Sequence, residues 1–367
     1  MQKLKVVFCT LFILIFSLCM SAYATEISAK GAVLLEADSG RVIFEKNKDL
    51  VLPMASTTKI MTALVTLENA KCDEIVTIEP CMTGIEGSSI YLKAGEELSV
   101  EELLYALILE SANDAAVALA YHVAGGIPEF AELMNEKAES LGLQSTHFEN
   151  PHGLDSDAHF TTAYELGVIA AYAMKNPDFK RIAATYKKII PARGESYERL
   201  LINHNRLLRS YKGAIGVKTG FTKKCGRCLV SCSEREGVTL VCVTLNDPND
   251  WQDHTRLLDY GFSCLESVTL SKRHGYTVEL NAINGDKSSF LAETLDDLSI
   301  TLDRDNINIS ANLEAQHLIP APIKAGDVVG QIVFYNDGIK INSVPLYAKE
   351  NVDAISYKKS FLKGLFK

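Results

Sequence analysis

A serine and a lysine stand three residues apart at Ser56 and Lys59, where an apolar segment begins. On a helix this spacing places both side chains on one face. A serine hydroxyl becomes a nucleophile when a base removes its proton, and a lysine can be that base when burial or a nearby cation lowers its pKa. The pair therefore predicts nucleophilic catalysis, with Ser56 as the nucleophile and Lys59 as the base.

Two further motifs follow this pair along the chain and set it apart from chance matches. They are Ser111-Ala112-Asn113 and Lys218-Thr219-Gly220. Chance matches to the first two motifs occur at Ser356 with Lys359, at Ser360 with Lys363, and at Ser310-Ala311-Asn312. All of these come after the Lys-Thr-Gly motif, so they cannot complete the same order. We interpret the last of them as surface strand sequence.

Helical patterns are expected to position the serine motifs. Ser99 and Glu102 form a capping box that opens a helix through residue 109, and a second helical pattern runs over 115–123. Ser111 falls in the loop between the two helices. Such a loop can project a serine and an amide into a cleft.

Around Lys218 the pattern changes to strands. Apolar runs separated by short polar turns predict an antiparallel sheet with strands at 214–217, 228–232 and 238–245. Gly220 has no side chain, so a substrate backbone could lie along this strand and pair with it. Lys218 brings a cation beside the nucleophile, where it can depress the pKa of Lys59 and attract a substrate carboxylate.

Two further elements are expected in this part of the chain. A hairpin is predicted for 31–36 and 41–45 around the turn Asp38-Ser39-Gly40. A helix over 251–262 closes the catalytic part. The first region therefore mixes helices with an antiparallel sheet.

The first 24 residues have the pattern of a secretory signal peptide. Lys3 and Lys5 precede an apolar run from Val6 to Met20, and Ala22-Tyr23-Ala24 ends with small residues. A membrane anchor is the alternative, but the run is shorter than the ~20 residues that span a bilayer. We predict cleavage after Ala24.

The predicted mature chain is acidic. Loss of Lys3 and Lys5, with no acids, changes the formal charge from −9 to −11 and leaves 343 residues. An acidic protein is a poor nucleic-acid binder, and this length is enough for two domains.

Seven cysteines remain in the mature chain, an odd number without a repeating framework. Cys225 and Cys228 form a CxxC motif, and no second CxxC motif accompanies it. We expect free structural thiols. A disulfide between Cys225 and Cys228 or between Cys228 and Cys232 is one alternative, and a metal site is another.

From about Val268 the pattern changes to short alternating runs with frequent turn residues. These predict a small all-β domain with strands at 277–280, 298–302, 306–310, 328–335 and 339–346. The end of the chain, from Ala354 to Lys367, has apolar residues at helical spacing with four lysines and no acid. It could lie on an anionic membrane surface, and a solvated disordered end is the alternative.

The expected organisation therefore has four parts: a signal peptide at 1–24, a catalytic domain at 25–267, a small β domain at 268–350 and a basic amphipathic tail at 351–367.

The three ordered motifs, the segment Asn150-Pro151-His152-Gly153-Leu154, the β domain and the tail together resemble the D-alanyl-D-alanine carboxypeptidases, which are low-molecular-mass penicillin-binding proteins. The resemblance covers nearly the whole mature chain. It implies an α+β fold, with a β-lactamase/transpeptidase-like catalytic domain whose antiparallel sheet is flanked by helices, followed by a small sandwich-like all-β domain. It also implies an extracytoplasmic enzyme attached peripherally to the membrane. The stretch 250–254 is similar to the version found in Gram-positive, often spore-forming bacteria.

The resemblance assigns the chemical steps to the serine motifs. Ser56 attacks the carbonyl between the last two D-alanines of a peptidoglycan stem peptide and forms an acyl-enzyme, and Lys59 acts as the base. Ser111 relays the proton to the departing D-alanine, and Asn113 holds the substrate amide. Penicillins mimic this substrate end and are expected to acylate Ser56. No metal or organic cofactor is needed.

The resemblance assigns substrate binding to the third motif. Lys218 and Thr219 bind the terminal carboxylate. The oxyanion lies between the backbone N–H groups of Ser56 and Phe221, the residue after Gly220.

Two positions depart from the family pattern. Ala112 stands where glycine is common in the family, but the alanine side chain need not face the cleft. His204 stands where some members have arginine, which leaves the full carboxylate-binding set open.

Three other functions compete with the carboxypeptidase. A D,D-endopeptidase that cuts crosslinks would use the same residues. A class A β-lactamase needs a carboxylate for deacylation, but its candidate, Glu165, is better explained as a capping box with Thr162, and residues 268–367 would be superfluous. A non-catalytic wall-binding scaffold would not need Ser56 and Lys59 together.

Overall fold

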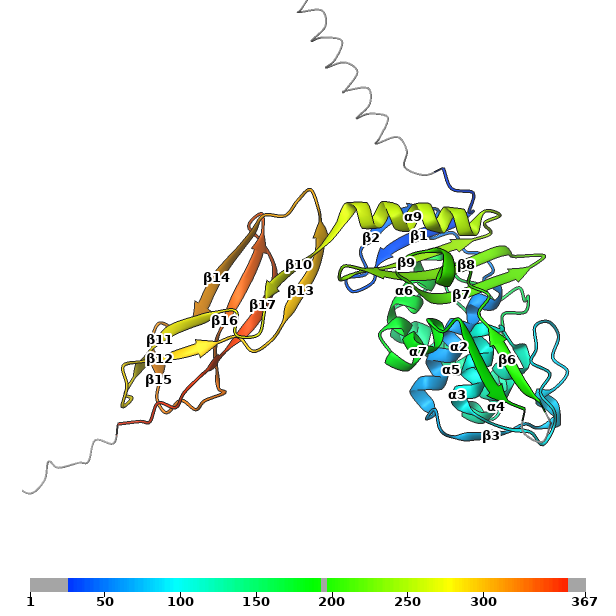
Figure 1. Ribbon diagram of the computed structural model, residues 1–367, viewed down its shortest axis with the longest axis horizontal. Coiled ribbons are helices and arrows are strands. Elements are labelled where there is room, and N and C mark those ends of the chain that lie inside the picture. The colour runs from blue at the N-terminus through cyan, green and yellow to red at the C-terminus, as the bar shows by residue number, and fades with distance from the viewer. Residues whose placement is uncertain (1–25, 193–196, 356–367) are drawn as a thin grey trace, which may run out of the picture. The chain divides into compact units, whose positions relative to one another are not determined.

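The computed structural model describes residues 26–192 and 197–355, and the chain divides into two compact units, the first ending at Ser263 and the second beginning at Cys264 (Figure 1). The predicted signal peptide, the tail beyond Ile355 and the chance serine–lysine pairs lie outside the described residues. In the described part of the chain, no helix combines the length and the apolar character needed to cross a membrane.

A five-stranded antiparallel sheet forms the centre of the first unit. Its order is β2-β1-β9-β8-β7, with β1 Gly31–Glu36, β2 Val42–Lys46, β7 Ala214–Thr222, β8 Gly226–Arg235 and β9 Val238–Leu245. The predicted hairpin is confirmed, and so are the three strands around the Lys-Thr-Gly motif. β7, which carries that motif, is an edge strand, so its outer side is available for pairing with a ligand.

Helices cover both faces of this sheet. Every residue of β1 is buried, as expected for a strand covered on both sides. Gly167, on α6 (Ala163–Met174), packs against Val33 and Leu35. Gly261, on α9 (Asp250–Cys264), packs against Leu34 on the opposite face of the same strand. The helices are α2 Lys59–Asn69, α3 Val100–Leu109, α4 Asn113–Ala124, α5 Ile127–Ser140, α6 Ala163–Met174, α7 Pro177–Ala183, α8 Leu207–Ser210 and α9 Asp250–Cys264.

Short elements join these layers. They are the 3₁₀ turns η1 Ala55–Thr58 and η2 Pro80–Met82, and two small sheets formed by β3 Ile75–Thr77 with β4 Glu97–Ser99 and by β5 Lys187–Pro191 with β6 Glu198–Ile202. The capping box predicted at the start of α3 is confirmed, because Ser99 and Glu102 each accept a hydrogen bond from the other's backbone N–H.

The second predicted capping box is only half correct. The Thr162 side chain accepts a hydrogen bond from the Glu165 backbone N–H and caps α6. The Glu165 carboxylate does not return to Thr162 but accepts hydrogen bonds from the backbone N–H groups of Gln144 and Ser145 and from the Thr146 hydroxyl. Glu165 therefore connects the 144–146 loop to α6. The expected structural role holds, but the carboxylate contacts this loop and not the Thr162 N–H.

The second unit is all-β. A six-stranded sheet has the order β14-β16-β17-β12-β11-β15, and β10 pairs with β13. Its apolar core includes Phe290, Phe334 and Leu346. The strands are β10 Leu265–Ser271, β11 Thr277–Ile283, β12 Ser289–Glu293, β13 Leu298–Asp303, β14 Ile309–Ala315, β15 Ile319–Pro320, β16 Val328–Asn336 and β17 Ile339–Ala348.

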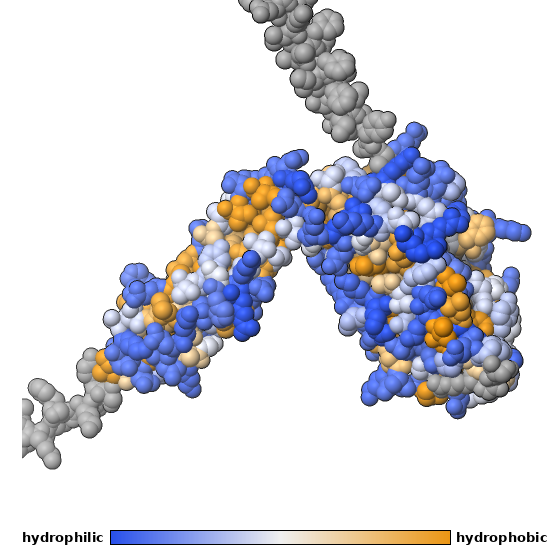
Figure 2. Space-filling model, in the orientation of Figure 1, coloured by the Kyte–Doolittle hydropathy of each residue, from blue (hydrophilic) through white to orange (hydrophobic). Residues whose placement is uncertain are grey.

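The predicted α+β class with a C-terminal β region is confirmed, but the strand list was incomplete. β10, β12 and β15 were missed, and the strand expected at 306–310 begins only at Ile309. Ser310 to Asn312 lie exposed on β14, which confirms their interpretation as surface strand sequence. Figure 2 shows apolar patches among polar side chains on this unit, and its exposed apolar residues include Val328 and Ile339.

Candidate active site

Ser56 and Lys59 face each other at the start of α2, as predicted, although Ser56 lies in the 3₁₀ turn η1 and not in the α-helix. The Lys59 side chain is fully buried. Its Nζ atom donates hydrogen bonds to three oxygens: Ser56 Oγ at 3.1 Å, Asn113 Oδ1 at 2.6 Å and the His152 carbonyl at 2.6 Å. Three acceptors fix the position of the amine beside the hydroxyl.

Burial controls the charge of this amine. Desolvation holds the pKa of Lys59 well below its usual range, and the nearby cation of Lys218 lowers it further. The buried carboxylate of Asp114 acts in the opposite direction but does not restore the ordinary value. The lowered pKa favours the neutral form of Lys59, which is the form that can accept a proton.

The loop between α3 and α4 carries the second motif. Ser111 is buried, lines the cleft and has a left-handed φ of 60°. Asn113 connects this loop to its neighbours, since its backbone N–H donates to Ser88 O at 2.7 Å and its Nδ2 to Glu86 O at 2.5 Å. The motif thereby contacts both Lys59 and the 86–88 segment.

The third motif lies on β7, and the side chain of its lysine is buried. The Nζ atom of buried Lys218 donates a hydrogen bond to Thr219 O at 2.9 Å. Lys218 is not among the residues that line the cleft. Desolvation lowers the pKa of Lys218 to about 7, opposed by the charge of Glu110. Lys218 therefore acts on Lys59 from within the protein, whereas Thr219 faces the cleft.

Gly220 lets β7 approach η1, the turn that carries Ser56. A Cβ at this position would lie 3.1 Å from the backbone nitrogens of both Ser56 and Thr57, which is too close for ordinary packing. Phe221 follows with a side chain that is 65 % exposed and lines the cleft. The strand and the turn thus meet at the position where an oxyanion site was expected.

The Asn150–Leu154 segment packs against η1, the turn that carries Ser56. Gly153 has a φ of +86°, and a Cβ there would lie only 2.0 Å from the backbone oxygen of Ala55, so only glycine fits. His152 contributes its carbonyl to Lys59, and burial lowers the pKa of its imidazole to about 3. His152 is therefore neutral at physiological pH.

These residues surround a cleft of about 370 Å³. It is lined by Ser56, Ser88, Ser111, His204, Arg206, Thr219, Gly220, Phe221, Arg227, Asp250 and Trp251. Sequence reasoning assigned no role to Ser88, Arg206, Arg227 or Trp251, because single polar residues so far apart carry no motif. A larger hollow of about 990 Å³ lies in the second unit, but its lining contains no nucleophile or base from the motifs.

The D-alanyl-D-alanine carboxypeptidase model of the Peptidase S11 family matches residues 19–249, and the model of the C-terminal domain of penicillin-binding protein 5 matches residues 266–354. The chain belongs to the D-alanyl-D-alanine carboxypeptidase family. This confirms the resemblance, and the enzyme is a serine-type carboxypeptidase of the penicillin-binding proteins, as predicted.

Relatives of the enzyme match it over most of their length. The carboxypeptidase DacF of Bacillus subtilis is 32% identical over 91% of this chain and 88% of its own, and DacC of Escherichia coli is 33% identical over 90% and 86%. The crystal structure of penicillin-binding protein 5 from Haemophilus influenzae covers 90% of this chain and 98% of its own, with 28% identity and a TM-score of 0.69.

Within the described residues, Cys225, Cys228, Cys232 and Cys242 are buried thiols that form no disulfide. Burial raises the pKa values of Cys228 and Cys232 to about 12, so these thiols are unreactive at neutral pH. Within the described ranges, no cluster of three or more His, Cys, Asp or Glu residues could hold a metal ion.

Proposed function

We propose that the enzyme removes the terminal D-alanine of peptidoglycan stem peptides through an acyl-enzyme on Ser56. One observation carries the assignment of roles. Asn113 Oδ1 and the His152 carbonyl can only accept hydrogen bonds, whereas the Ser56 hydroxyl can also donate. When Lys59 is neutral, its two protons satisfy the two obligate acceptors, and its lone pair faces the Ser56 hydroxyl.

The acylation step follows from this arrangement. Lys59 takes the proton of Ser56 as Oγ bonds to the carbonyl carbon, and the oxyanion forms between the N–H groups of Ser56 and Phe221. Ser111 relays this proton from Lys59 to the nitrogen of the departing D-alanine as the peptide bond breaks. Water then adds to the ester, the shortened peptide leaves, and Ser56 regains its proton. Asn113 holds Lys59 and the substrate amide.

The terminal carboxylate is proposed to bind Thr219 and Arg206. The amine of Lys218 is buried and bonded to Thr219 O, so it does not line the cleft. Among the cations in the cleft lining, Arg227 makes a two-point ion pair with Asp250, and His204 lies 3.3 Å from Glu110. The guanidinium of Arg206 lies 5.9 Å from the ring of Trp251 and has no carboxylate within ion-pair distance among the described residues.

The location of the enzyme is also a proposal. We retain cleavage after residue 24 and a catalytic domain at 25–267, a β domain at 268–350 and a basic tail at 351–367 that holds the enzyme on an anionic membrane surface. The two family models match on either side of residues 250–265, which supports the domain division. Fractionation of cells that express the enzyme with and without residues 356–367 tests the tail.

The function is tested with two substrates. The mature enzyme and Ser56→Ala are incubated with diacetyl-Lys-D-Ala-D-Ala and with a crosslinked muropeptide dimer, and free D-alanine and monomer are measured by mass spectrometry. Release of D-alanine by the wild type alone is expected. Monomer without D-alanine would make the enzyme an endopeptidase, and no product from either substrate would refute catalysis.

A further inference from the structure

An exposed tyrosine that closely follows a cleft residue in the sequence has no part in the steps above. Tyr91 is 80 % exposed, and its φ of 59° is a left-handed conformation that bulky side chains rarely adopt. Strained residues of this kind persist only where their surroundings hold them, and they cluster at functional sites. Tyr91 follows Ser88, which lines the catalytic cleft, by three residues.

Buried polar groups hold this residue from one side. The Asp114 carboxylate accepts hydrogen bonds from the backbone N–H groups of Ile90 and Leu92 and from the Ser89 hydroxyl. The Ser89 hydroxyl in turn accepts one from the Tyr91 N–H at 2.9 Å. Asp114 is fully buried and directly follows the motif residue Asn113, so the segment is tied to the catalytic loop.

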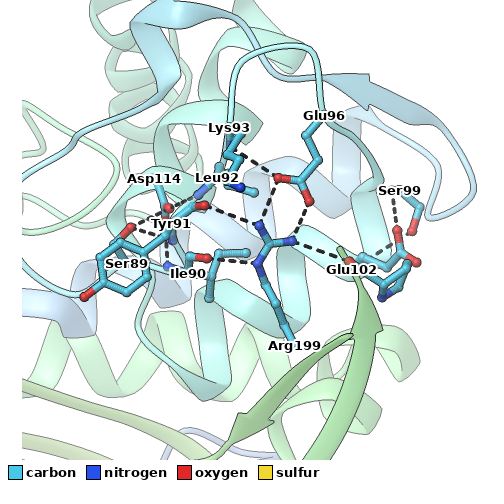
Figure 3. A network of polar contacts seen from close by, with 11 residues as sticks. Ser89, Ile90, Tyr91, Leu92, Lys93, Glu96, Ser99, Glu102, Asp114 and Arg199 are labelled. Atoms are coloured by element: carbon cyan, nitrogen blue, oxygen red, sulfur yellow. Dashed lines mark hydrogen bonds and ion pairs between the residues drawn. The ribbon is translucent and has the colours of Figure 1, made fainter. Parts of the chain in front are cut away.

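An arginine holds it from the other side. Arg199 on β6 donates from Nε to Ile90 O at 2.9 Å and from a terminal nitrogen to Tyr91 O at 3.3 Å. Its guanidinium makes a buried two-point ion pair with Glu96 at 2.5 and 2.9 Å. Figure 3 shows Asp114 and Arg199 on either side of the segment and the Tyr91 ring pointing away from Glu96.

The left-handed backbone of Tyr91 and the hydrogen bonds around it therefore hold in place an aromatic ring that is largely exposed to solvent. We propose that Tyr91 is a specificity-determining residue that contacts the stem peptide N-terminal to the reacting D-Ala-D-Ala pair. Tyr91 lies three positions after Ser88, a stretch that spans at most about 10 Å. An extended substrate covers this distance in about three residues, which is the length of the stem before the reacting pair. The proposal rests on the carboxypeptidase function proposed above.

The test compares two substrates that react at the same bond. Diacetyl-Lys-D-Ala-D-Ala lacks the two N-terminal residues of the stem, and the full stem pentapeptide has them. Tyr91→Ala is expected to lower kcat/KM for the pentapeptide about five- to tenfold, the loss of about 1 kcal/mol of contact, and to leave the short peptide unchanged. Tyr172→Ala, which removes another partly exposed tyrosine, on α6, serves as the matched control.

A second variant separates contact from folding. Tyr91→Gly removes the ring at a position where glycine is unstrained, so its melting temperature is expected to equal or exceed that of the wild type while the pentapeptide preference is lost. Equal losses on both substrates, no loss on the pentapeptide, or a lower melting temperature of Tyr91→Gly would overturn the proposal. Failure of the wild type to release D-alanine from the short peptide would instead refute the proposed function.

Discussion

Replacing Lys218 by methionine is expected to raise the stability of the folded enzyme while lowering its activity. The Lys218 amine is buried, with one hydrogen bond, to Thr219 O at 2.9 Å. Burial lowers the pKa of Lys218 from 10.5 to about 7. The unfolded chain keeps the ordinary value, so folding is linked to the loss of a proton from this group.

The sign and the size follow from that difference. Between pH 7 and 10.5 the unfolded chain binds the proton and the folded chain does not, so the free energy of unfolding rises with pH in this window and is flat on either side. About 3.5 pH units at about 1.4 kcal/mol each correspond to about 5 kcal/mol. Methionine fills the volume of the lysine stem, and loss of one hydrogen bond subtracts about 1 kcal/mol. At pH 7 we expect a net gain of about 2–4 kcal/mol.

Urea unfolding of the wild type and Lys218→Met, from pH 6 to pH 10.5, measures this effect. The difference between the two proteins should shrink as the pH rises, because the wild type regains its stability when Lys218 is neutral. Fluorescent penicillin labelling should slow in the variant, since the cation that lowers the pKa of Lys59 is gone. A pH-independent difference, or a variant less stable at pH 7, would refute the argument.

Three further predictions concern the surroundings of the site. Gly153→Ala should lower the free energy of unfolding, measured in urea, by about 2–4 kcal/mol and slow penicillin labelling, because its Cβ would lie 2.0 Å from the Ala55 backbone oxygen. The control is Gly142→Ala, where φ is +76° but the Cβ would enter open space. This variant should lose only about 1 kcal/mol. Glu165→Gln should lower stability by about 1–3 kcal/mol and leave the release of the penicilloyl group unchanged, and an altered release rate would contradict its structural role. A thiol reagent at pH 7 should label exposed Cys81 first, and fast labelling of any buried cysteine would contradict the raised pKa values of those thiols.

The sequence predicted those features of the site that depend on local spacing. Three residues from Ser56 to Lys59 became a 3.1 Å contact, and alternating apolar runs placed Lys218 on an antiparallel strand. The capping box at Ser99 is equally local, since its partners lie within one helical turn. Such features are decided by neighbours in the chain, so no knowledge of the tertiary fold is needed.

Features that depend on contacts between segments remote in the sequence could not be predicted. Glu165 has the spacing of a capping box, but its carboxylate meets the 144–146 loop, which is positioned only by the tertiary structure. Arg206 and Trp251 reach the cleft from segments remote from Ser56, and neither has a motif. The burial of the Lys218 amine and its hydrogen bond to Thr219 O depend on how β7 packs in the fold, which local spacing does not reveal.

Because two lysine amines are buried at the site, the charge of the Asp114 carboxylate affects the pKa of Lys59. A pair of desolvated amines destabilises the fold at neutral pH, and the Asp114 carboxylate is the group that opposes this at Lys59. The same carboxylate holds the backbone of the Ser89–Leu92 segment. Asp114→Asn would keep acceptors for some of these contacts but remove the charge, so the pKa of Lys59 should fall further. The acid limb of the penicillin acylation rate should then move to lower pH, and a shift to higher pH would contradict this coupling.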